Sequence, residues 1–165
     1  MLSLSPLADN NRFEEQAGSA AMKTSPPSEL PRGSAKAPPE AEISLRVQYF
    51  ETDRMGVVHH SNYLRYFETA RMEQFRNWGY PYDQLEQAGC RLMITDLECK
   101  CRKPARFDEV LRVRTWIEKM TTYRIVHRYR IESERHQLVA LGKTVLASVN
   151  KEGYPVPLSE FLPIE

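Results

Sequence analysis

The stretch FETDRMGVVHHSNYLRYF, residues 50 to 67, stands where the periodicity of the sequence changes. It contains an acid, Asp53, a glycine, Gly56, and two adjacent histidines directly before an amphipathic run. The segment that precedes it alternates between apolar and polar residues, and its apolar face is formed by Ile43, Leu45, Val47 and Tyr49. This alternation predicts a half-buried strand that begins at residue 43. The chain therefore passes from a strand to a different element within one short loop.

The segment that follows the loop has helical periodicity. Residues 61 to 79 carry large apolar side chains at helical spacing, namely Leu64, Phe67, Phe75 and Trp78. Ser61 is the predicted N-cap and Gly79 the predicted C-cap, so both ends of the helix are marked. Residues 80 to 89 then predict a short second helical turn that ends at Gly89.

The rest of the chain has the pattern of strands. Alternation predicts strands over residues 91 to 103, 109 to 119, 122 to 132 and 139 to 149. In the first of these, one face is expected to carry Met93, Thr95, Leu97, Cys99 and Cys101. Short turns between the strands favour antiparallel pairing. The predicted fold class is α+β, with an antiparallel five-stranded sheet packed around one long helix.

The first 41 residues differ in composition from the remainder. They hold six of the eleven prolines of the chain, interspersed with Ser, Ala and Gly. Such a segment buries too little apolar surface to offset its conformational entropy. We expect a disordered Pro/Ser/Ala-rich tail over residues 1–41 and one folded domain over residues 42–165, with Met22 as an alternative start of the natural protein.

Composition excludes several classes of partner. The chain has 23 Lys and Arg against 22 Asp and Glu, a formal charge of +1, so no overall field attracts nucleic acid or an anionic membrane. No apolar run approaches the ~20 residues that span a bilayer, so no integral membrane contact is expected. The three cysteines, Cys90, Cys99 and Cys101, lack the spacing of a zinc site, and they indicate reduced thiols in a cytoplasmic protein.

The loop combines groups that acyl transfer requires. Asp53 precedes a tight turn at Gly56, and the first free backbone N–H groups of the helix are expected near residues 59 to 63. A carboxylate can attack a carbonyl or activate water, and N–H groups at a helix N-terminus can stabilise an oxyanion. The alternative is an Asx-type turn in which Asp53 only satisfies nearby N–H groups. Spacing alone leaves both interpretations open.

The motif around this loop resembles that of a known family. V-x-Y-F-E-T-D-x-M-G-V-V-H-H-S-N-Y-L-x-Y-F-E-T-A-R is similar to the signature of the 4-hydroxybenzoyl-CoA thioesterase family of hotdog-fold proteins. Within that family it resembles the small bacterial acyl-CoA thioesterases associated with the Tol-Pal cluster. The resemblance covers about residues 43 to 160 and includes a second match at RKPARFDEVLRVRTWIE, residues 102 to 118.

The resemblance implies a hotdog fold and hydrolysis of an acyl-CoA thioester to a free acid and coenzyme A, with no metal and no organic cofactor. It implies homodimers or homotetramers with active sites at the subunit interfaces. Asp53 falls on the catalytic aspartate of the family, and the backbone N–H of His60 falls where the family polarises the thioester carbonyl. Glu51 stands where many members have Asp, and His59 where many have Tyr.

The neighbouring residues have less specific roles. Asp53 can act as nucleophile or as general base. Gly56, His59, Asn62 and Tyr63 are candidate substrate-binding residues, although capping and core packing would also explain them.

Other charged residues have weaker claims to a role in catalysis or binding. Glu68 is a rival carboxylate, but an i,i+3 ion pair with Arg71 is the favoured explanation. Two groups of basic residues could contact coenzyme A phosphates or form a solvated face, namely Arg102, Lys103 and Arg106, and Arg124, Arg128 and Arg130.

Two other function classes remain open from the residues alone. A non-catalytic acyl-carrier or membrane-assembly interaction module could keep the same scaffold, although it would not need Asp53. A dehydratase acting on acyl carriers would share the fold, but the HHSNY sequence does not match the placement of its histidine.

Overall fold

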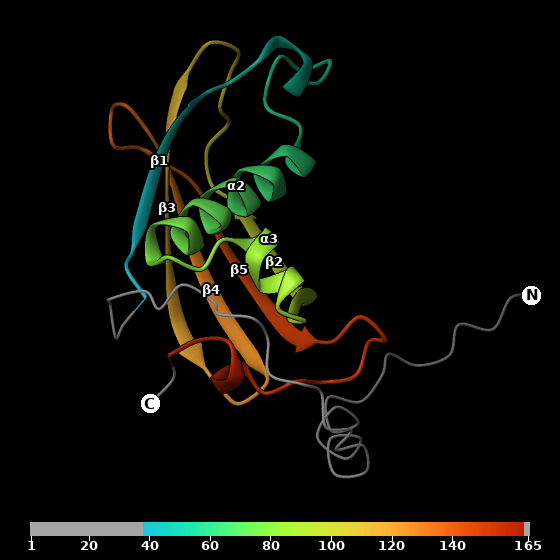
Figure 1. Cartoon of the computed structure of the whole chain (residues 1–165). Coiled ribbons are helices and arrows are strands. Elements are labelled where there is room, and N and C mark those ends of the chain that lie inside the picture. Colours follow the sequence, from blue (N-terminus) through green and yellow to red (C-terminus); the bar gives the residue numbers. More distant parts are fainter. Residues whose placement is uncertain (1–37, 164–165) are drawn as a thin grey trace, which may run out of the picture.

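The computed structural model describes residues 38–163, with one long helix, a shorter helix and five strands. Figure 1 shows them in chain order: β1 (Ala41–Arg46), the 3-10 turn η1 (Tyr49–Glu51), α2 (His60–Trp78), α3 (Tyr82–Gln87), β2 (Arg91–Cys101), β3 (Val110–Met120), β4 (Arg124–Ser133), β5 (Leu138–Val149) and the 3-10 turn η2 (Leu158–Glu160). Most of the expected tail, residues 1–37, lies outside the described residues, so the domain boundary stays a prediction. Strand β1 begins at Ala41, two residues before the expected start at residue 43.

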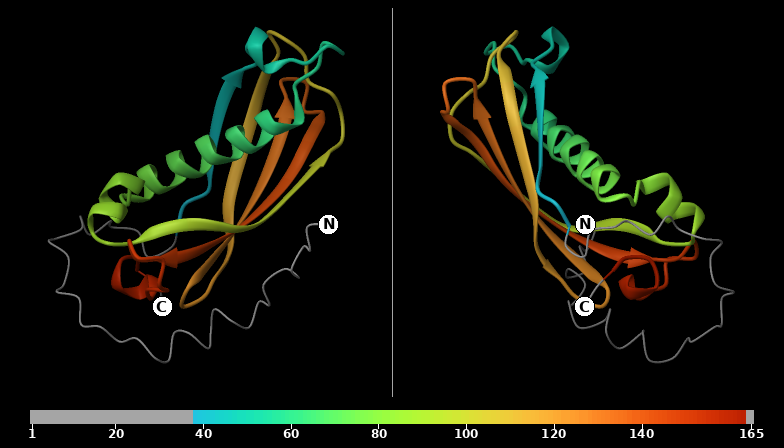
Figure 2. Two further views of the ribbon diagram at one scale, coloured as in Figure 1. Left: turned by 90° about the vertical axis from the view of Figure 1, so that its right-hand side faces the viewer. Right: turned by 60° about the vertical axis from the view of Figure 1, so that its left-hand side comes forward.

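The strands form one antiparallel sheet in the order β1-β3-β4-β5-β2. Helix α2 crosses one face of the sheet, and the sheet curves around it (Figure 2). This arrangement confirms the expected α+β fold of five antiparallel strands around one long helix. Within residues 38–163, no helix is both long and apolar enough to cross a membrane.

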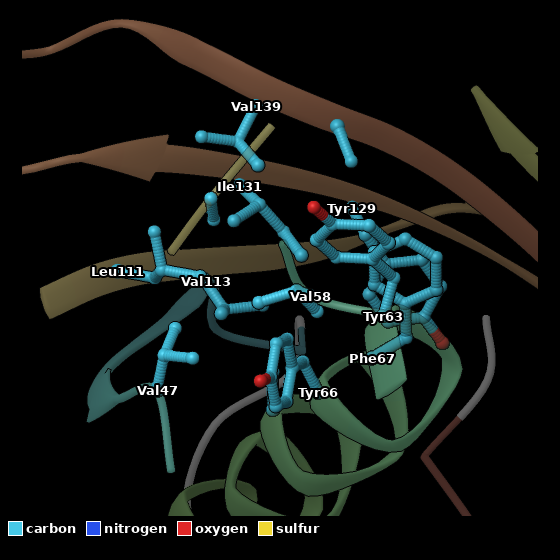
Figure 3. Close-up of a cluster of buried hydrophobic side chains, with 13 residues drawn as sticks. Val47, Val58, Tyr63, Tyr66, Phe67, Leu111, Val113, Tyr129, Ile131 and Val139 are labelled. Atoms are coloured by element: carbon cyan, nitrogen blue, oxygen red, sulfur yellow. The ribbon is translucent and has the colours of Figure 1, made fainter. Parts of the chain in front are cut away.

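The core beneath the first half of α2 combines aliphatic side chains with four aromatic ones. Figure 3 shows this cluster, in which the rings of Phe67 and Tyr129 stack with centroids 4.5 Å apart. Strand β5 makes room for Phe67 at Gly142, where an added Cβ would lie 2.4 Å from the Phe67 ring. A second cluster, centred on Phe75, Trp78 and Leu85, lies beneath the second half of the helix and α3. Helix α2 is therefore held against the sheet along its whole length.

The two ends of α2 test the predicted caps. Gly79 is the C-cap, with φ of 90°, as predicted. At the other end, the prediction that Ser61 is the N-cap was wrong. His59 is the N-cap, and its ring accepts a hydrogen bond from the Ser61 N–H. The backbone N–H of His59 donates to the Glu51 carbonyl at 2.8 Å, which keeps His59 extended and lets the helix begin at His60.

Strand β2 does not present the single face that its alternation predicted. The register with β5 shifts between Ile94 and Asp96, so Met93 pairs with Ala147 on one face while Cys99 pairs with Gly142 on the other. A bulge of this kind moves every later side chain to the opposite face. Because β2 is an edge strand, Met93, Ile94 and Leu97 also remain 55%, 46% and 40% exposed.

Candidate active site

The turn that carries Asp53 is closed by backbone hydrogen bonds. The N–H of Asp53 donates to the Val57 carbonyl at 2.9 Å, and the N–H of Gly56 donates to the Asp53 carbonyl at 2.9 Å. Gly56 has φ of 73°, a left-handed conformation that glycine adopts without strain. The turn therefore needs a residue such as Gly56 at this position.

The carboxylate of Asp53 is only partly engaged. Its Oδ1 accepts a hydrogen bond of 2.8 Å from the Met55 N–H, so the Asx-type turn considered from the sequence is present. Within the described part of the chain, Oδ2 accepts no hydrogen bond, and the residue is half-buried. One oxygen thus fixes the orientation of the side chain and leaves the other free to react.

Three backbone N–H groups around the start of α2 have backbone acceptors. The N–H of Val58 donates to Ala105, that of His59 to Glu51, and that of Asn62 to the His59 carbonyl, at 2.8, 2.8 and 2.9 Å. The N–H of Ser61 donates to the His59 ring. The His60 N–H has no acceptor among residues 38–163. A free donor at the first position of a helix is suited to bind an anion or a polarised carbonyl oxygen.

The two histidines have different surroundings. The Nδ1 atom of His59 lies 2.8 Å from the Ser61 hydroxyl and accepts the Ser61 N–H at 3.4 Å. The His60 ring packs on the His59 ring with centroids 4.1 Å apart, and both side chains are exposed. One imidazole therefore caps the helix, while the other is open to a ligand.

Asn62 and Tyr63 point toward the protein interior. The Asn62 side-chain amide donates to the Glu51 carbonyl at 2.8 Å, and Asn62 is 7% exposed. Tyr63 is 3% exposed, and burial, followed by the charge of Cys101, raises its pKa to about 12. Asn62 thus fastens the helix to the preceding turn, and Tyr63 belongs to the hydrophobic cluster beneath the site.

The rival acid lies farther along the helix. Glu68 is eight residues after His60, about 12 Å along the helix axis. Its carboxylate is 3.9 Å from the Arg71 guanidinium, and its side chain is 61% exposed. Arg71 instead donates at 2.9 and 3.0 Å to the hydroxyls of Tyr82 and Tyr129. The Glu68 to Arg71 pair exists, but the hydroxyls are the closer partners of Arg71.

The two basic groups also differ. Arg128 and Arg130 on β4 pair with Glu118 and Glu132 at 2.9 and 2.7 Å, as expected of a solvated strand face. In the other group, Arg102, Lys103 and Arg106 are all exposed. The Arg106 guanidinium lies 3.9 Å from the point where a Cβ on Gly56 would stand, so this group borders the Asp53 turn.

The residues that sequence reasoning missed are the partners of the Glu51 side chain. Its carboxylate accepts hydrogen bonds of 2.8 Å from the Gln48 N–H and from the Tyr66 hydroxyl. The departure at Glu51 from the family motif was the one available signal, since no periodicity argument joins residues 15 positions apart.

Residues 38–163 leave the site open to solvent, since Asp53 is half-buried and His60 is exposed. A cavity of about 460 Å³ lies between residues 103–110 and the β4–β5 connection, and neither Asp53 nor His60 lines it. No group of three or more His, Cys, Asp or Glu side chains within the described range is arranged to hold a metal ion. The candidate reactive groups in the described chain are an open carboxylate oxygen, an open backbone N–H and the neighbouring imidazoles.

Comparison with known proteins identifies relatives over most of the described residues. A family model described as the thioesterase-like superfamily matches residues 47–163. A protein of Aquifex aeolicus (strain VF5), named as a candidate esterase, is 36% identical over 116 residues, which cover 65% of this chain and 89% of that protein. The acyl-CoA thioester hydrolase YbgC of Escherichia coli O157:H7 is 27% identical over 106 residues, 64% of this chain and 79% of that protein.

The fold is also similar to solved structures. The DHNA-CoA thioesterase from Staphylococcus aureus superposes with a TM-score of 0.72 and 32% sequence identity, over 75% of this chain and 84% of that chain. The similarity therefore extends from sequence to the arrangement of the helix and sheet.

Proposed function

Because the chain belongs to the thioesterase-like superfamily, we propose that it hydrolyses acyl-CoA thioesters to a free acid and coenzyme A. The observation that carries this proposal is that one short loop, residues 53–60, holds both a free Asp53 carboxylate oxygen and a free His60 N–H. Relatives named as acyl-CoA thioesterases support the choice of substrate. The resemblance of the loop motif further favours the small bacterial branch associated with the Tol-Pal cluster.

The two groups have complementary roles. The thioester carbonyl oxygen accepts a hydrogen bond from the His60 N–H, and the positive end of the α2 dipole stabilises the negative charge that develops there. Asp53 Oδ2 then attacks the carbonyl carbon, the C–S bond breaks, and the coenzyme A thiolate leaves and takes a proton from solvent. Water hydrolyses the resulting mixed anhydride to the acid and the Asp53 carboxylate. In the alternative route, Asp53 takes a proton from a water molecule that attacks the carbonyl directly.

Substitution of Asp53 tests this mechanism. Asp53→Asn keeps the size and the Oδ1 acceptor of the side chain but removes its charge, so we expect kcat to fall by about 10³-fold or more, as for the loss of a catalytic nucleophile or base. The matched control is Asp83→Asn on the exposed surface of α3, which should keep wild-type turnover. Thiol release from a panel of aliphatic and aromatic acyl-CoA thioesters is the measurement. Wild-type turnover in Asp53→Asn would refute the mechanism, and no thiol release from any thioester would favour a non-catalytic acyl-binding module.

We propose that a second copy of the chain completes the open site. Strand β2 pairs with β5 on one side only, and it exposes Met93, Ile94 and Leu97. Two such edges can pair with each other across a two-fold axis, which would bury these side chains. We expect a homodimer or homotetramer by analytical ultracentrifugation, and Leu97→Lys, which places a charge on this edge, should shift it toward monomer. A wild-type monomer at micromolar concentration would contradict this assembly.

We also place the protein in the cytoplasm. Cys90, Cys99 and Cys101 are free thiols, and reduced cysteines are typical of that compartment. Cell fractionation with a tagged chain tests this placement.

A further inference from the structure

We propose that Glu51 is a positioning residue, which holds the Asp53 turn in register with the free N–H of His60, and that Tyr66 fixes Glu51 in this role. The proposal rests on the thioesterase function, because it concerns the geometry of that site. It adds two residues to which neither the motif nor the proposed mechanism gives a role.

The backbone of Glu51 fastens the turn to the start of α2. Its carbonyl oxygen accepts two hydrogen bonds of 2.8 Å, from the His59 N–H and from the side-chain amide of Asn62. These two donors flank His60, the residue whose N–H is free. The position of the helix start is therefore set relative to Glu51.

The side chain of Glu51 fastens the same turn to two further elements. Its Oε2 accepts the Gln48 N–H, two residues after β1, and the Tyr66 hydroxyl from the second turn of α2, both at 2.8 Å. Tyr66 is 4% exposed, and burial followed by the hydrogen bond to Glu51 raises its pKa, so the hydroxyl remains a proton donor. A hydrogen bond to a carboxylate is stronger than one between neutral groups, particularly where water is largely excluded.

Glu51 thus accepts four hydrogen bonds from three parts of the chain, and Asp53 follows it after one residue. Glu51 links the segment that carries Asp53 directly to the start of α2, beside the bridge between Thr52 and Val58 that closes the turn. Displacement of a reacting group by about 1 Å can reduce a rate ~10²-fold. Loss of the Glu51 side-chain bonds should therefore reduce kcat, while KM changes little because Glu51 donates no group to the substrate.

Substitutions at both ends of the Tyr66 to Glu51 bond test the proposal. Tyr66→Phe removes only the hydroxyl and should lower kcat about 10-fold, with KM within about twofold. Glu51→Ala removes both side-chain bonds and should lower kcat about 100-fold. Glu51→Gln keeps an acceptor oxygen at the same place, so its kcat should be close to that of the wild type. The proposal is overturned if Tyr66→Phe and Glu51→Ala keep wild-type kcat, or if Glu51→Gln is as slow as Glu51→Ala.

Tyr82→Phe is the matched control for general loss of stability. It removes a partly buried tyrosine hydroxyl that accepts a hydrogen bond from Arg71, near the opposite end of α2. We expect a similar fall in Tm and an unchanged kcat. If Tyr82→Phe lowered kcat as much as Tyr66→Phe, the fall in kcat would result from general destabilisation, and the positioning role would be refuted.

Hydrogen exchange separates this proposal from the proposed function. In Glu51→Ala the amides of residues 53 to 62 should exchange faster than in the wild type, whereas those of β4 should not change. This measurement needs no substrate. If the wild type hydrolysed no thioester, the proposed function would fail, but hydrogen exchange would still decide whether Glu51 orders the turn. Equal exchange in Glu51→Ala and the wild type would refute the positioning role.

Discussion

The two halves of α2 differ in how far the polar groups packed around them are satisfied by hydrogen bonds. At the first half, Glu51, Asn62 and Tyr66 are joined by hydrogen bonds, and the N–H of His60 has no acceptor in the described chain. Beneath the second half, Gln74 Oε1, Thr115 Oγ1 and both ring nitrogens of His127 make no hydrogen bond within residues 38–163, although all three residues are fully buried.

This difference reflects two requirements, a fixed geometry at the candidate site and a helix held firmly against the sheet. A reactive geometry needs directional bonds, because a turn of a few residues has little packing of its own. The second half of the helix is held by aromatic packing around Phe75 and Trp78, and this packing tolerates polar groups without partners at a cost in stability. Substitutions in the first half should therefore change the rate, and those in the second half should change the free energy of unfolding.

Arg71 gives the largest expected effect in the second half. It is 3% exposed and donates to two tyrosine hydroxyls, so Arg71→Ala should lower the free energy of unfolding by about 3 kcal/mol through lost packing and lost hydrogen bonds. Arg71→Met keeps much of the volume and removes a buried charge, so it should cost about 1 kcal/mol. Urea unfolding measures both, and kcat per folded molecule should not change. A fall in kcat in either variant would show that the two halves are coupled.

Gly142 tests the junction between the two halves. A methyl group there would overlap the Phe67 ring, which stacks on Tyr129, so Gly142→Ala should cost about 2 kcal/mol of unfolding free energy. Phe67→Leu in the same chain should recover part of this loss, because the smaller side chain leaves room for the methyl group. Thermal unfolding of the single and double variants is the measurement, and strictly additive losses would contradict the predicted contact.

His127 gives the second half a dependence on pH. Burial, followed by the charge of Arg71, lowers its pKa from 6.5 to about 3. The unfolded chain therefore binds one proton more than the folded chain between about pH 6.5 and pH 3, and stability falls as pH falls through that window. His127 contributes at most about 1.4 kcal/mol per pH unit to the slope of the unfolding free energy against pH.

Urea unfolding at pH 7, 6 and 5 tests this dependence. The wild type should lose stability more steeply than His127→Leu, which has no proton to bind. Equal slopes in the two proteins would mean that the buried imidazole makes no contribution.

The sequence predicted the helix and strands better than the hydrogen bonds that join them. The strand, the turn at Gly56 and the helix followed from local periodicity, and the expected class, a thioester hydrolase, is confirmed by family membership. Bonds between distant residues could not be predicted in this way, such as Tyr66 to Glu51 and Arg71 to Tyr129. Nor does alternation reveal a bulge, which is why Met93 was assigned to the wrong face of β2. The roles given to Asp53 and the residues around it remain predictions.

His59 gives the smallest expected effect and the sharpest test of what the helix N-terminus requires. If the ring acts only as a cap, His59→Asn should keep the stability of the wild type to within a few tenths of a kcal/mol, and His59→Ala should lose about 1 kcal/mol. Both variants should keep KM, because a cap does not touch the substrate. Urea unfolding and steady-state kinetics on the best thioester separate the two roles. A raised KM in His59→Asn, at unchanged stability, would instead assign the imidazole to substrate binding, and its capping bond would then hold a ligand-binding ring in place as well as a helix.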